Sequence, residues 1–360
     1  MGQYILRRVL LAVPVIFGIM LMTFVLARVI PGDPCRAVLG ERATDKICDA
    51  FFKRHGLDQP IPIQFFRYVK QIALEGDFGN SLRFNRPVTE IMVERLPVTL
   101  ELAVAALAFA TFFGLIFGII SAYWHNSAID VGTMMGANIG VSMPVFWLGL
   151  MLQYLFALKF KGTIFQLPPS GRLTAGLDNL PFYEVWGWDL NEGTAFFTLC
   201  LFLSNLNLFN SIVTANWEVF WDAVQHLILP TIAVGTIPLA IIARITRSSL
   251  LEVLSLDYIR TARAKGLSEI LMVFRHALSN SLLPVVTIVG LQLGILLSGA
   301  VLTETIFNLA GLGRTLFEAI TARDYIIIQG MTLVVAVVFV FVNMMVDISY
   351  AFLDPRIRLS

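Results

Sequence analysis

Long apolar stretches separated by polar segments dominate the pattern of the chain. A bilayer's hydrocarbon core needs about 20 apolar residues in a helix, and six stretches meet that length. The six predicted spans are residues 9–29, 99–122, 134–158, 228–246, 281–302 and 329–352. Gly and Pro interrupt several of them, which membrane helices tolerate because neighbouring helices satisfy the freed backbone groups. The pattern therefore predicts an all-α integral membrane protein.

A seventh apolar stretch, residues 196–213, is shorter and is broken by polar side chains. These are Ser204, Asn205, Asn207, Asn210 and Ser211. Because polar groups are costly inside hydrocarbon, we expect an external helix that lies at the membrane face or packs on the spans. The alternative is a seventh span.

The distribution of basic residues orients the spans. Short cytoplasmic segments carry an excess of Lys and Arg. With six spans, the segments placed inside contain Arg7, Arg8, Arg244, Arg247, Arg260, Arg263, Lys265, Arg275, Arg356 and Arg358. Seven spans would move the basic segment 244–280 and the C-terminus outside. We therefore expect both termini in the cytoplasm, with large extracytoplasmic segments after spans 1 and 3.

Composition supports a membrane protein and excludes several other classes. The chain is 57% hydrophobic but only 14% charged, against about 25% charged residues in soluble domains. A net charge of +1 gives no field that favours nucleic acid. Three Cys and four His show no metal-site spacing, so no metal is predicted. Residues 1–30 have an apolar run too long for a signal peptide, so we expect a retained first span.

These observations divide the chain into three parts. Residues 1–30 form the N-terminal tail and first span, and residues 31–98 form an extracytoplasmic segment. Residues 99–360 form the membrane core, which includes an extracytoplasmic insertion at 159–227 and a cytoplasmic loop at 247–280.

The stretch from Asp257 to Glu269 is the most informative segment of the cytoplasmic loop. Small and basic side chains alternate in it, and Gly266 can end a helix with a positive φ. We expect a short helix, a glycine break and a second helix along the inner membrane surface. Small side chains such as Ala262 and Ala264 let another protein approach closely. A solvated linker that supplies positive charge is an equal alternative on composition alone.

The sequence of this segment resembles that of a known protein family. It resembles the coupling motif of importer-type ABC permeases, and is closest to the B-type dipeptide and oligopeptide permease subunits, a family that also includes nickel and opine permeases. The sequence RTARAKG at 260–266 and the sequence HALSN at 276–280 match the peptide branch. Against the general motif, Arg260 replaces an acid, His276 an isoleucine and Ser279 a proline.

Other short motifs in the same order extend the resemblance over nearly the whole chain. They are residues 4–8, 31–34, 77–82, 95–100, 142–146, 303–307, 311–313 and 354–358. The outer segment near 178–216 departs from the pattern because it is longer and more apolar.

The resemblance implies a six-helix type I ABC importer transmembrane domain in the cytoplasmic (inner) membrane of a prokaryote. It implies a heterodimer with a second permease subunit, two ATP-binding subunits and an extracytoplasmic solute-binding protein. No GxxxxGK[ST] motif occurs, so we expect no enzyme activity and no cofactor in this chain; ATP and Mg²⁺ would bind the partner ATPases. The implied cargo is a short peptide, with a nickel chelate or another small solute as the alternative. The implied ATPase-coupling residues are Asp257, Tyr258, Arg260, Thr261, Ala262, Arg263, Ala264, Lys265, Gly266 and Leu267.

Polar residues within or next to the spans are candidates for a substrate pathway, because such groups are costly in lipid and often functional. They are Asn138, Ser142, Gln153, Gln292, Ser298, Glu304 and Asn343, with Asp347 near the cytoplasmic end of the last span. Interhelical hydrogen bonding is the alternative for each of these except Glu304. Glu304 would face a substrate amine or reach water.

Two cysteines lie in the first outer segment, where disulfides persist. Cys35 and Cys48 would close a short loop if they were bonded. Two free thiols are the alternative, because spacing does not fix connectivity.

Overall fold

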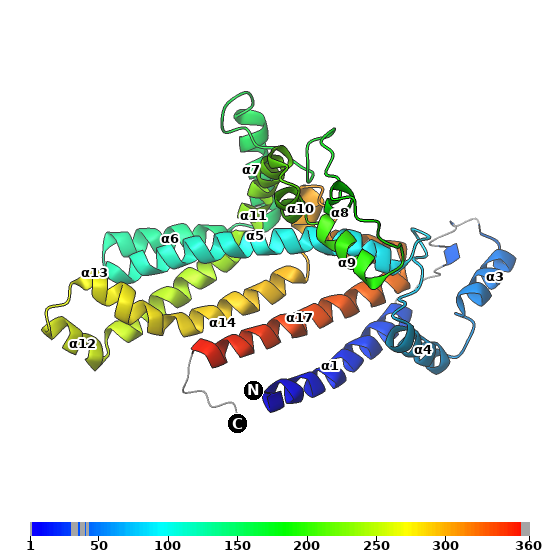
Figure 1. The fold of residues 1–360 in the computed structure, drawn as a ribbon, viewed down its shortest axis with the longest axis horizontal. Helices are drawn as coiled ribbons and strands as arrows, with labels where there is room; N and C mark the ends of the chain where they lie inside the picture. Colours follow the sequence, from blue (N-terminus) through cyan, green and yellow to red (C-terminus); the bar gives the residue numbers. More distant parts are fainter. Residues whose placement is uncertain (1, 30–34, 37–39, 41–42, 354–360) are drawn as a thin grey trace.

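A computed structural model describes residues 2–29, 35–36, 40 and 43–353. Apart from an isolated bridge between Asn80 and Pro87, the regular structure of these residues is helical (Figure 1). The long helices are α1 (Gly2–Val29), α5 (Val88–Tyr123), α11 (Trp217–Leu254), α14 (Leu278–Leu297) and α17 (Tyr325–Leu353). The shorter ones are α3 (Asp45–His55), α4 (Ile61–Lys70), η1 (Gln71–Glu75), α6 (Ala128–Ser142), α7 (Val145–Gln153), η2 (Tyr154–Lys159), α8 (Phe182–Val185), α9 (Ala195–Ser204), α10 (Asn207–Val213), α12 (Asp257–Ala264), α13 (Glu269–Leu271), η3 (Met272–Ala277), α15 (Val301–Ile306) and α16 (Leu312–Ala322).

Five helices of the described chain are long and apolar enough to cross a membrane. They are Leu6–Leu26, Val88–Tyr123, Trp217–Leu254, Glu269–Leu297 and Tyr325–Val346. Two bent helix pairs would raise the number to seven if each pair counted as one span. Five of the six predicted spans fall within or largely within these five helices.

The remaining predicted span, residues 134–158, is not one continuous helix. The segment consists of α6 followed by α7 and η2, and the two parts meet at an angle of 98°. Pro144 causes the break, because its ring disfavours a helical conformation in the preceding residue. Met143 accordingly has an extended backbone, with φ −94° and ψ 132°.

Residues 196–213 do not form one straight helix either. They belong to α9 and α10, which meet at 96°. The polar side chains of this segment are used inside the fold: Asn210 donates to Asn179 Oδ1 at 2.6 Å and to the Leu180 carbonyl at 2.8 Å. Its own Oδ1 accepts from the Phe182 N–H at 2.8 Å. Asn210, which interrupts the apolar run, therefore ties α10 to the part of the insertion that precedes α9.

The helices α5 and α11 form the centre of the molecule and pack along each other over most of their length. Glycine makes the close approach possible. A Cβ atom at Gly118 would lie 2.5 Å from the Thr246 Cβ atom and 2.7 Å from the Ala243 carbonyl oxygen. Small residues allow helix backbones to approach in this way in membrane proteins. The pair is a rigid frame on which the polar sites at both ends depend.

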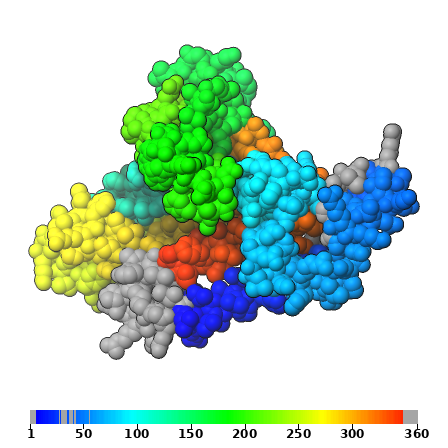
Figure 2. Space-filling view, turned by 45° about the vertical axis from the view of Figure 1, so that its right-hand side comes forward, coloured from blue at the N-terminus to red at the C-terminus, as the bar shows by residue number. Residues whose placement is uncertain are grey.

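The opposite ends of the molecule carry different elements (Figure 1). The helix α12 lies at one end, toward which α1 begins and α17 terminates, and α3 and α4 lie at the other. Figure 2 shows the insertion (green) and the region around α12 (yellow) as separate lobes. This arrangement is compatible with the expected separation of a coupling loop and both termini from the first outer segment.

Burial separates central from peripheral spans. Only 11% of the apolar window in α1 is buried, against 67% of the window in α11. The exposed apolar face of α1 requires lipid or another protein, since water would solvate it poorly. α11 instead contacts α5, α6, α10 and α14.

Of the two alternatives for the outer cysteines, the structure contains the disulfide between Cys35 and Cys48. It ties the chain that follows α1 to the first turn of α3. The family-like motifs at 31–34 and 354–358 lie outside the described residues.

Candidate docking site and translocation pathway

The predicted coupling segment is a short helix attached to the membrane core by one buried side chain. α11 ends at Leu254, and α12 begins after a two-residue turn. Ile259 is fully buried in a cluster formed with Ala122, Leu250, Val253, Met272, Val273 and Ala277. These residues come from α5, α11 and η3. Motion of α12 is thus mechanically linked to three parts of the core, a role that our sequence prediction did not assign to Ile259.

The other predicted coupling residues form the outer surface of this segment. Ala262 and Leu267 are half-buried, and the remaining eight are exposed: Asp257, Tyr258, Arg260, Thr261, Arg263, Ala264, Lys265 and Gly266. Small residues and cations therefore face outward, and the apolar anchor faces inward. Such a surface can dock another protein while Ile259 transmits the contact.

Gly266 separates the two helices of the coupling segment, as its position in the sequence predicts. Its φ of +80° is a left-handed conformation that glycine adopts without steric cost. Arg263 reaches across this break to Glu269, with Nε–Oε1 at 2.7 Å and Nη2–Oε2 at 3.2 Å. The hydrogen bond to Glu269 raises the pKa of the Arg263 guanidinium. The bidentate pair bridges α12 and α13 across the glycine.

A second polar contact connects α12 to the start of α14. Asn280 Nδ2 donates to the Tyr258 hydroxyl at 2.8 Å and to the His276 carbonyl at 3.1 Å. The HALSN motif thus contributes a structural contact to the RTARAKG motif. The sequence placed the two motifs in order but gave no sign of this bond.

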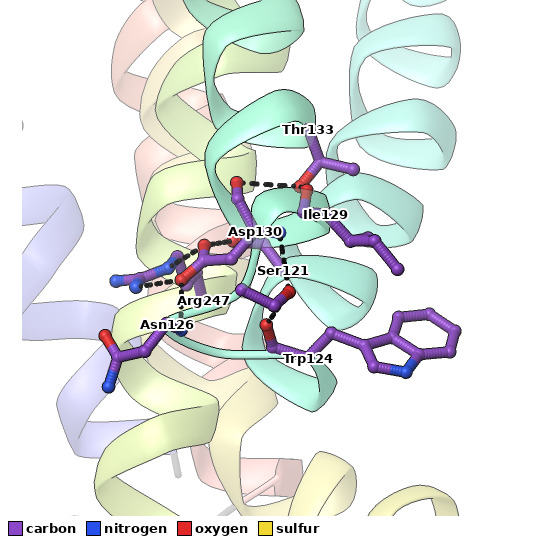
Figure 3. Close-up of polar contacts among 8 residues, drawn as sticks. Ser121, Trp124, Asn126, Ile129, Asp130, Thr133 and Arg247 are labelled. Atoms are coloured by element: carbon purple, nitrogen blue, oxygen red, sulfur yellow. Dashed lines mark hydrogen bonds and ion pairs between the residues drawn. The ribbon is translucent and has the colours of Figure 1, made fainter.

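An ion pair that was not predicted from the sequence lies beside the coupling segment, with its carboxylate buried (Figure 3). Arg247 on α11 donates to the Asp130 carboxylate through Nε at 2.8 Å and Nη2 at 2.7 Å. The Asn126 N–H at 2.9 Å and the Ser121 hydroxyl also donate to this carboxylate. Ser127 caps the helix by accepting from the Asp130 N–H. The pair ties the α5–α6 turn to α11, seven residues before α11 ends.

Each partner of this ion pair had a recognisable feature in the sequence, but neither feature pointed to the other partner. Arg247 was counted only as cytoplasmic positive charge. The run Asn126-Ser127 followed by Asp130 is typical of a helix start, with an acid in the first turn. Nothing in the sequence connects these two positions, which are 117 residues apart.

A second buried ion pair lies toward the other end of α5 and was also missed. Arg172 Nη2 donates to Glu101 Oε2 at 2.7 Å and to the Asn205 carbonyl at 2.6 Å. The other carboxylate oxygen accepts from the Leu208 N–H at 2.8 Å. This site fastens the insertion and the start of α10 to the membrane core.

Two predicted pathway residues, Asn138 and Gln153, contact other elements. Asn138 accepts from Arg244 at 3.1 Å, and Gln153 donates to the carbonyls of Pro169 and Ile306 at 2.7 and 3.0 Å. These are interhelical or helix–loop contacts, the alternative considered from the sequence.

Glu304 has neither of the environments expected for it. Its side chain is fully buried and accepts from the Thr99 hydroxyl and from the Arg314 N–H, both at 2.8 Å. It therefore ties α15 to α5 and to the start of α16, without reaching water.

Three other predicted pathway residues bond within their own helices. Ser142, Ser298 and Asn343 donate to backbone carbonyls four residues earlier. Gln292 is buried, and the side chain of Asp347 lies outside the described residues. Among the described contacts, only Ser142 and Asn138 of the predicted pathway set are bonded to each other. The structure does not bring the set together into one site.

Two family models match successive parts of the chain. Residues 114–359 match the family model of the binding-protein-dependent transport system inner membrane component. Residues 1–103 match the model of the N-terminal part of such a membrane component. The boundary between the two matches falls within α5.

Full-length relatives agree with these matches. The chain is 44% identical to a dipeptide transport system permease protein of Alkalihalophilus pseudofirmus, covering 99% of this chain and 100% of the relative. It is 45% identical to a di/tripeptide transport system permease protein of Pseudomonas aeruginosa, covering 99% of both chains. A glutathione transport system permease protein of Salmonella paratyphi A is 35% identical, again over 99% of both. The chain therefore belongs to the family of inner membrane components of binding-protein-dependent transport systems.

Proposed function

We propose that this chain is the transmembrane permease subunit of an ATP-driven importer that moves short peptides across the cytoplasmic membrane. The observation that carries the proposal is the exposed RTARAKG surface of α12 in a chain whose full-length relatives are named peptide permeases. The relatives' names include dipeptides, di- and tripeptides and glutathione, all short peptides. A nickel chelate or another small solute is the second candidate, supported only by the breadth of the resembled family.

The proposed partners follow from what this chain lacks and what it exposes. Without a phosphate-binding GxxxxGK[ST] loop in the sequence, ATP and Mg²⁺ would bind two separate ATP-binding subunits that dock at α12. A second, different permease chain would complete the pathway, because the predicted pathway residues of one chain form no common site. An extracytoplasmic solute-binding protein would deliver the cargo to the outer segments.

The proposed coupling runs from α12 through Ile259 to the core. ATP binding would draw the ATPase subunits together and displace α12. Because Ile259 contacts residues of α5, α11 and η3, that displacement would reach the spans directly. Alternating access of the pathway would follow from motion of these helices.

Docking is tested by adding bulk to the exposed surface without touching the anchor. Ala264 is exposed, so Ala264→Trp leaves the Ile259 cluster intact but prevents close approach of a partner. We expect this variant to insert into membranes normally and to lose co-purification with the ATP-binding subunits. Ala175→Trp makes the same change at an exposed position of the insertion, and this matched control retains them. Equal recovery of ATPase subunits with both variants would contradict docking at α12.

The cargo is tested with the whole complex reconstituted in vesicles. Uptake of dipeptides, longer peptides and nickel chelates is compared at matched concentrations, each with its loaded binding protein. We expect dipeptide to drive both uptake and ATP turnover. ATP turnover that responds to a nickel chelate and to none of the peptides would replace the peptide assignment with the second candidate.

A further inference from the structure

A small cavity lies where the outer end of α1 meets α4 and the start of α17. Its volume is about 120 Å³, several times the ~15 Å³ that one water needs on this measure. Arg28, Arg67, Tyr68 and Gln329 are among its lining residues. Figure 1 shows α4 beside the end of α1 and the start of α17. The cavity is outside every site described above.

Arg28 is held in a fixed orientation in this cavity. Its Nε donates to Gln64 Oε1 at 2.9 Å, and its Nη1 donates to the Phe24 carbonyl at 3.2 Å. The guanidinium carbon lies 3.4 Å from the centre of the Phe24 ring. These contacts are all with uncharged groups, so the positive charge is positioned but not neutralised by them. Within the described part of the chain, Arg28 forms no ion pair with a carboxylate.

Two further polar groups in the cavity are buried and unpartnered. Neither the Tyr68 hydroxyl nor the Gln329 amide nitrogen has a hydrogen-bond partner among the described residues. Gln329 is only 4% exposed, and an unsatisfied buried donor costs about 1–3 kcal/mol. Burial raises the pKa of the Tyr68 phenol, although the nearby Arg28 opposes this shift. The hydroxyl therefore stays protonated at neutral pH and is able to donate.

Arg67 adds a second cation to the same cavity. A Cβ atom at Gly56 would lie 2.8 Å from its Nη1, so the guanidinium of this otherwise exposed residue lies close to the turn that ends α3. None of the described residues that line this cavity is Asp or Glu, although Asp49 and Asp58 line the adjoining, more open cavity that shares Arg28. Two guanidinium groups, a phenol and an amide N–H thus line one cavity, and this donor set suits an oxyanion.

The position of Arg28 along the predicted first span suggests which oxyanion the cavity would encounter. Arg28 is the first charged residue after Arg8, and it directly follows the uncharged, mostly apolar run of residues 9–27. Arginine at the end of a span lies at the level of the lipid headgroups. Phosphate is the oxyanion abundant at that level.

We propose that this cavity is a phosphate-binding site, in which Arg28 and Arg67 form charge-assisted hydrogen bonds and Tyr68 and Gln329 donate to the remaining oxygens. A phospholipid headgroup that enters beside α1 supplies the phosphate. Occupation of the site joins α1 and α4 to α17, and so fastens the first outer segment to the membrane core.

The test uses the full chain purified in mild detergent with its co-purifying subunits, after extensive delipidation. Thermal unfolding is followed while one of three additives is titrated: a short-chain phosphatidylglycerol, the corresponding short-chain diacylglycerol without phosphate, and inorganic phosphate. We expect the phospholipid to raise Tm and the diacylglycerol to leave it unchanged. Inorganic phosphate that raises Tm as effectively as the phospholipid would retain the phosphate site but overturn the lipid as its source.

Variants link the effect to the cavity. Arg28→Gln should raise the phospholipid concentration that gives the half-maximal Tm increase by about tenfold or more, the effect expected for loss of a charge-assisted hydrogen bond. Arg28→Lys should raise this concentration less. Arg54→Gln removes an exposed cation from the same outer segment and is the matched control. Each variant is compared with its own unliganded Tm, so a destabilised variant remains informative. The same response in Arg28→Gln as in the unsubstituted chain, or an equal response to diacylglycerol, would overturn the proposal.

Discussion

Two buried carboxylate–arginine pairs lie toward opposite ends of α5, and they differ in what surrounds each arginine. Arg247 donates two hydrogen bonds, both to Asp130. Arg172 divides its bonds between Glu101 and the Asn205 carbonyl. Loss of the carboxylate would therefore leave Arg247 without an acceptor, whereas Arg172 would keep one. Although the two pairs have similar chemistry, we expect the stability of the fold to depend more on Asp130 than on Glu101.

The separation of the two pairs along α5 matches the thickness of a membrane. Glu101 and Ser121, the α5 residue that contacts Asp130, are 20 positions apart. At ~1.5 Å per residue this corresponds to ~30 Å, about the thickness of the hydrocarbon core. Between them Thr111 is the only side chain, apart from glycine, that is not hydrophobic. We infer that each pair lies near one face of the membrane, where water and headgroups lower the cost of a charge.

The two pairs also join different kinds of element. The Asp130–Arg247 pair connects two central helices next to α12. The Glu101–Arg172 pair connects the centre to the insertion, which carries α9 and α10. We infer that the first maintains the geometry through which the docking segment acts, and that the second positions an outer attachment.

Removal of the Asp130 carboxylate should have the largest effect. Asp130→Ala leaves Arg247 unpaired and frees the Ser121 hydroxyl and the Asn126 N–H. We expect a loss of about 3 kcal/mol in the free energy of unfolding, the lower end of the range for a broken buried pair, because Arg247 is partly exposed. Thermal unfolding of the full chain in mild detergent measures it.

The control is Asp257→Ala, which removes a carboxylate from the exposed pair with Arg260. No measurable change in unfolding is expected for this variant. If both substitutions lowered stability equally, burial and bond number would not explain the importance of Asp130.

The same pair can be disturbed without changing a charge. In Gly118→Val, the new side chain collides with Thr246 and with the Ala243 carbonyl, one turn from Arg247. Overpacking of this kind costs about 2 kcal/mol and should move α11 away from α5. Combination with Asp130→Ala should be less than additive, because both changes break one contact. Full additivity in thermal unfolding would show that the Gly118 contact and the ion pair are independent.

The sequence predicted most spans but not the contacts between them. Long apolar runs specify a membrane helix by themselves, so five of six predicted spans were found in long apolar helices. Pro144 was visible in the sequence. Because membrane helices often tolerate proline, its presence alone did not show that the helix would break there. Residue 130 and residue 247 meet only after α5, α6 and α11 have packed. No local pattern contains that information.

The candidate docking site likewise has features that local sequence predicts and features that depend on tertiary packing. Exposure of the RTARAKG residues and the break at Gly266 follow from local sequence, whereas the anchoring role of Ile259 depends on a cluster assembled from three distant segments. The pathway residues were chosen for polarity within spans. Ser142, Ser298 and Asn343 satisfy that polarity within their own helices, so polarity alone did not indicate a shared site.

The outer pair should show a smaller effect. Glu101→Gln keeps an acceptor for the Leu208 N–H and leaves Arg172 bonded to Asn205. We expect a loss of about 1 kcal/mol, concentrated in the insertion. Hydrogen–deuterium exchange should become faster in α9 and α10 while α12 is unchanged, and Asp130→Ala should give the opposite pattern. Faster exchange in α12 of Glu101→Gln would contradict the assignment of the two pairs to separate regions.

The exposed pair between Arg263 and Glu269 should have the smallest effect on stability. Both side chains are about half exposed, and such pairs contribute little because water and salt screen them. We expect Glu269→Gln to leave thermal unfolding unchanged, and the double exchange Arg263→Glu with Glu269→Arg to do the same. Exchange in α12 should nevertheless be faster in the single variant, because the contact across Gly266 is lost, and should be restored in the double variant. If the single variant lowered Tm as much as Glu101→Gln, the docking segment would be as tightly coupled to the fold as the buried pairs, and burial would no longer separate the two classes.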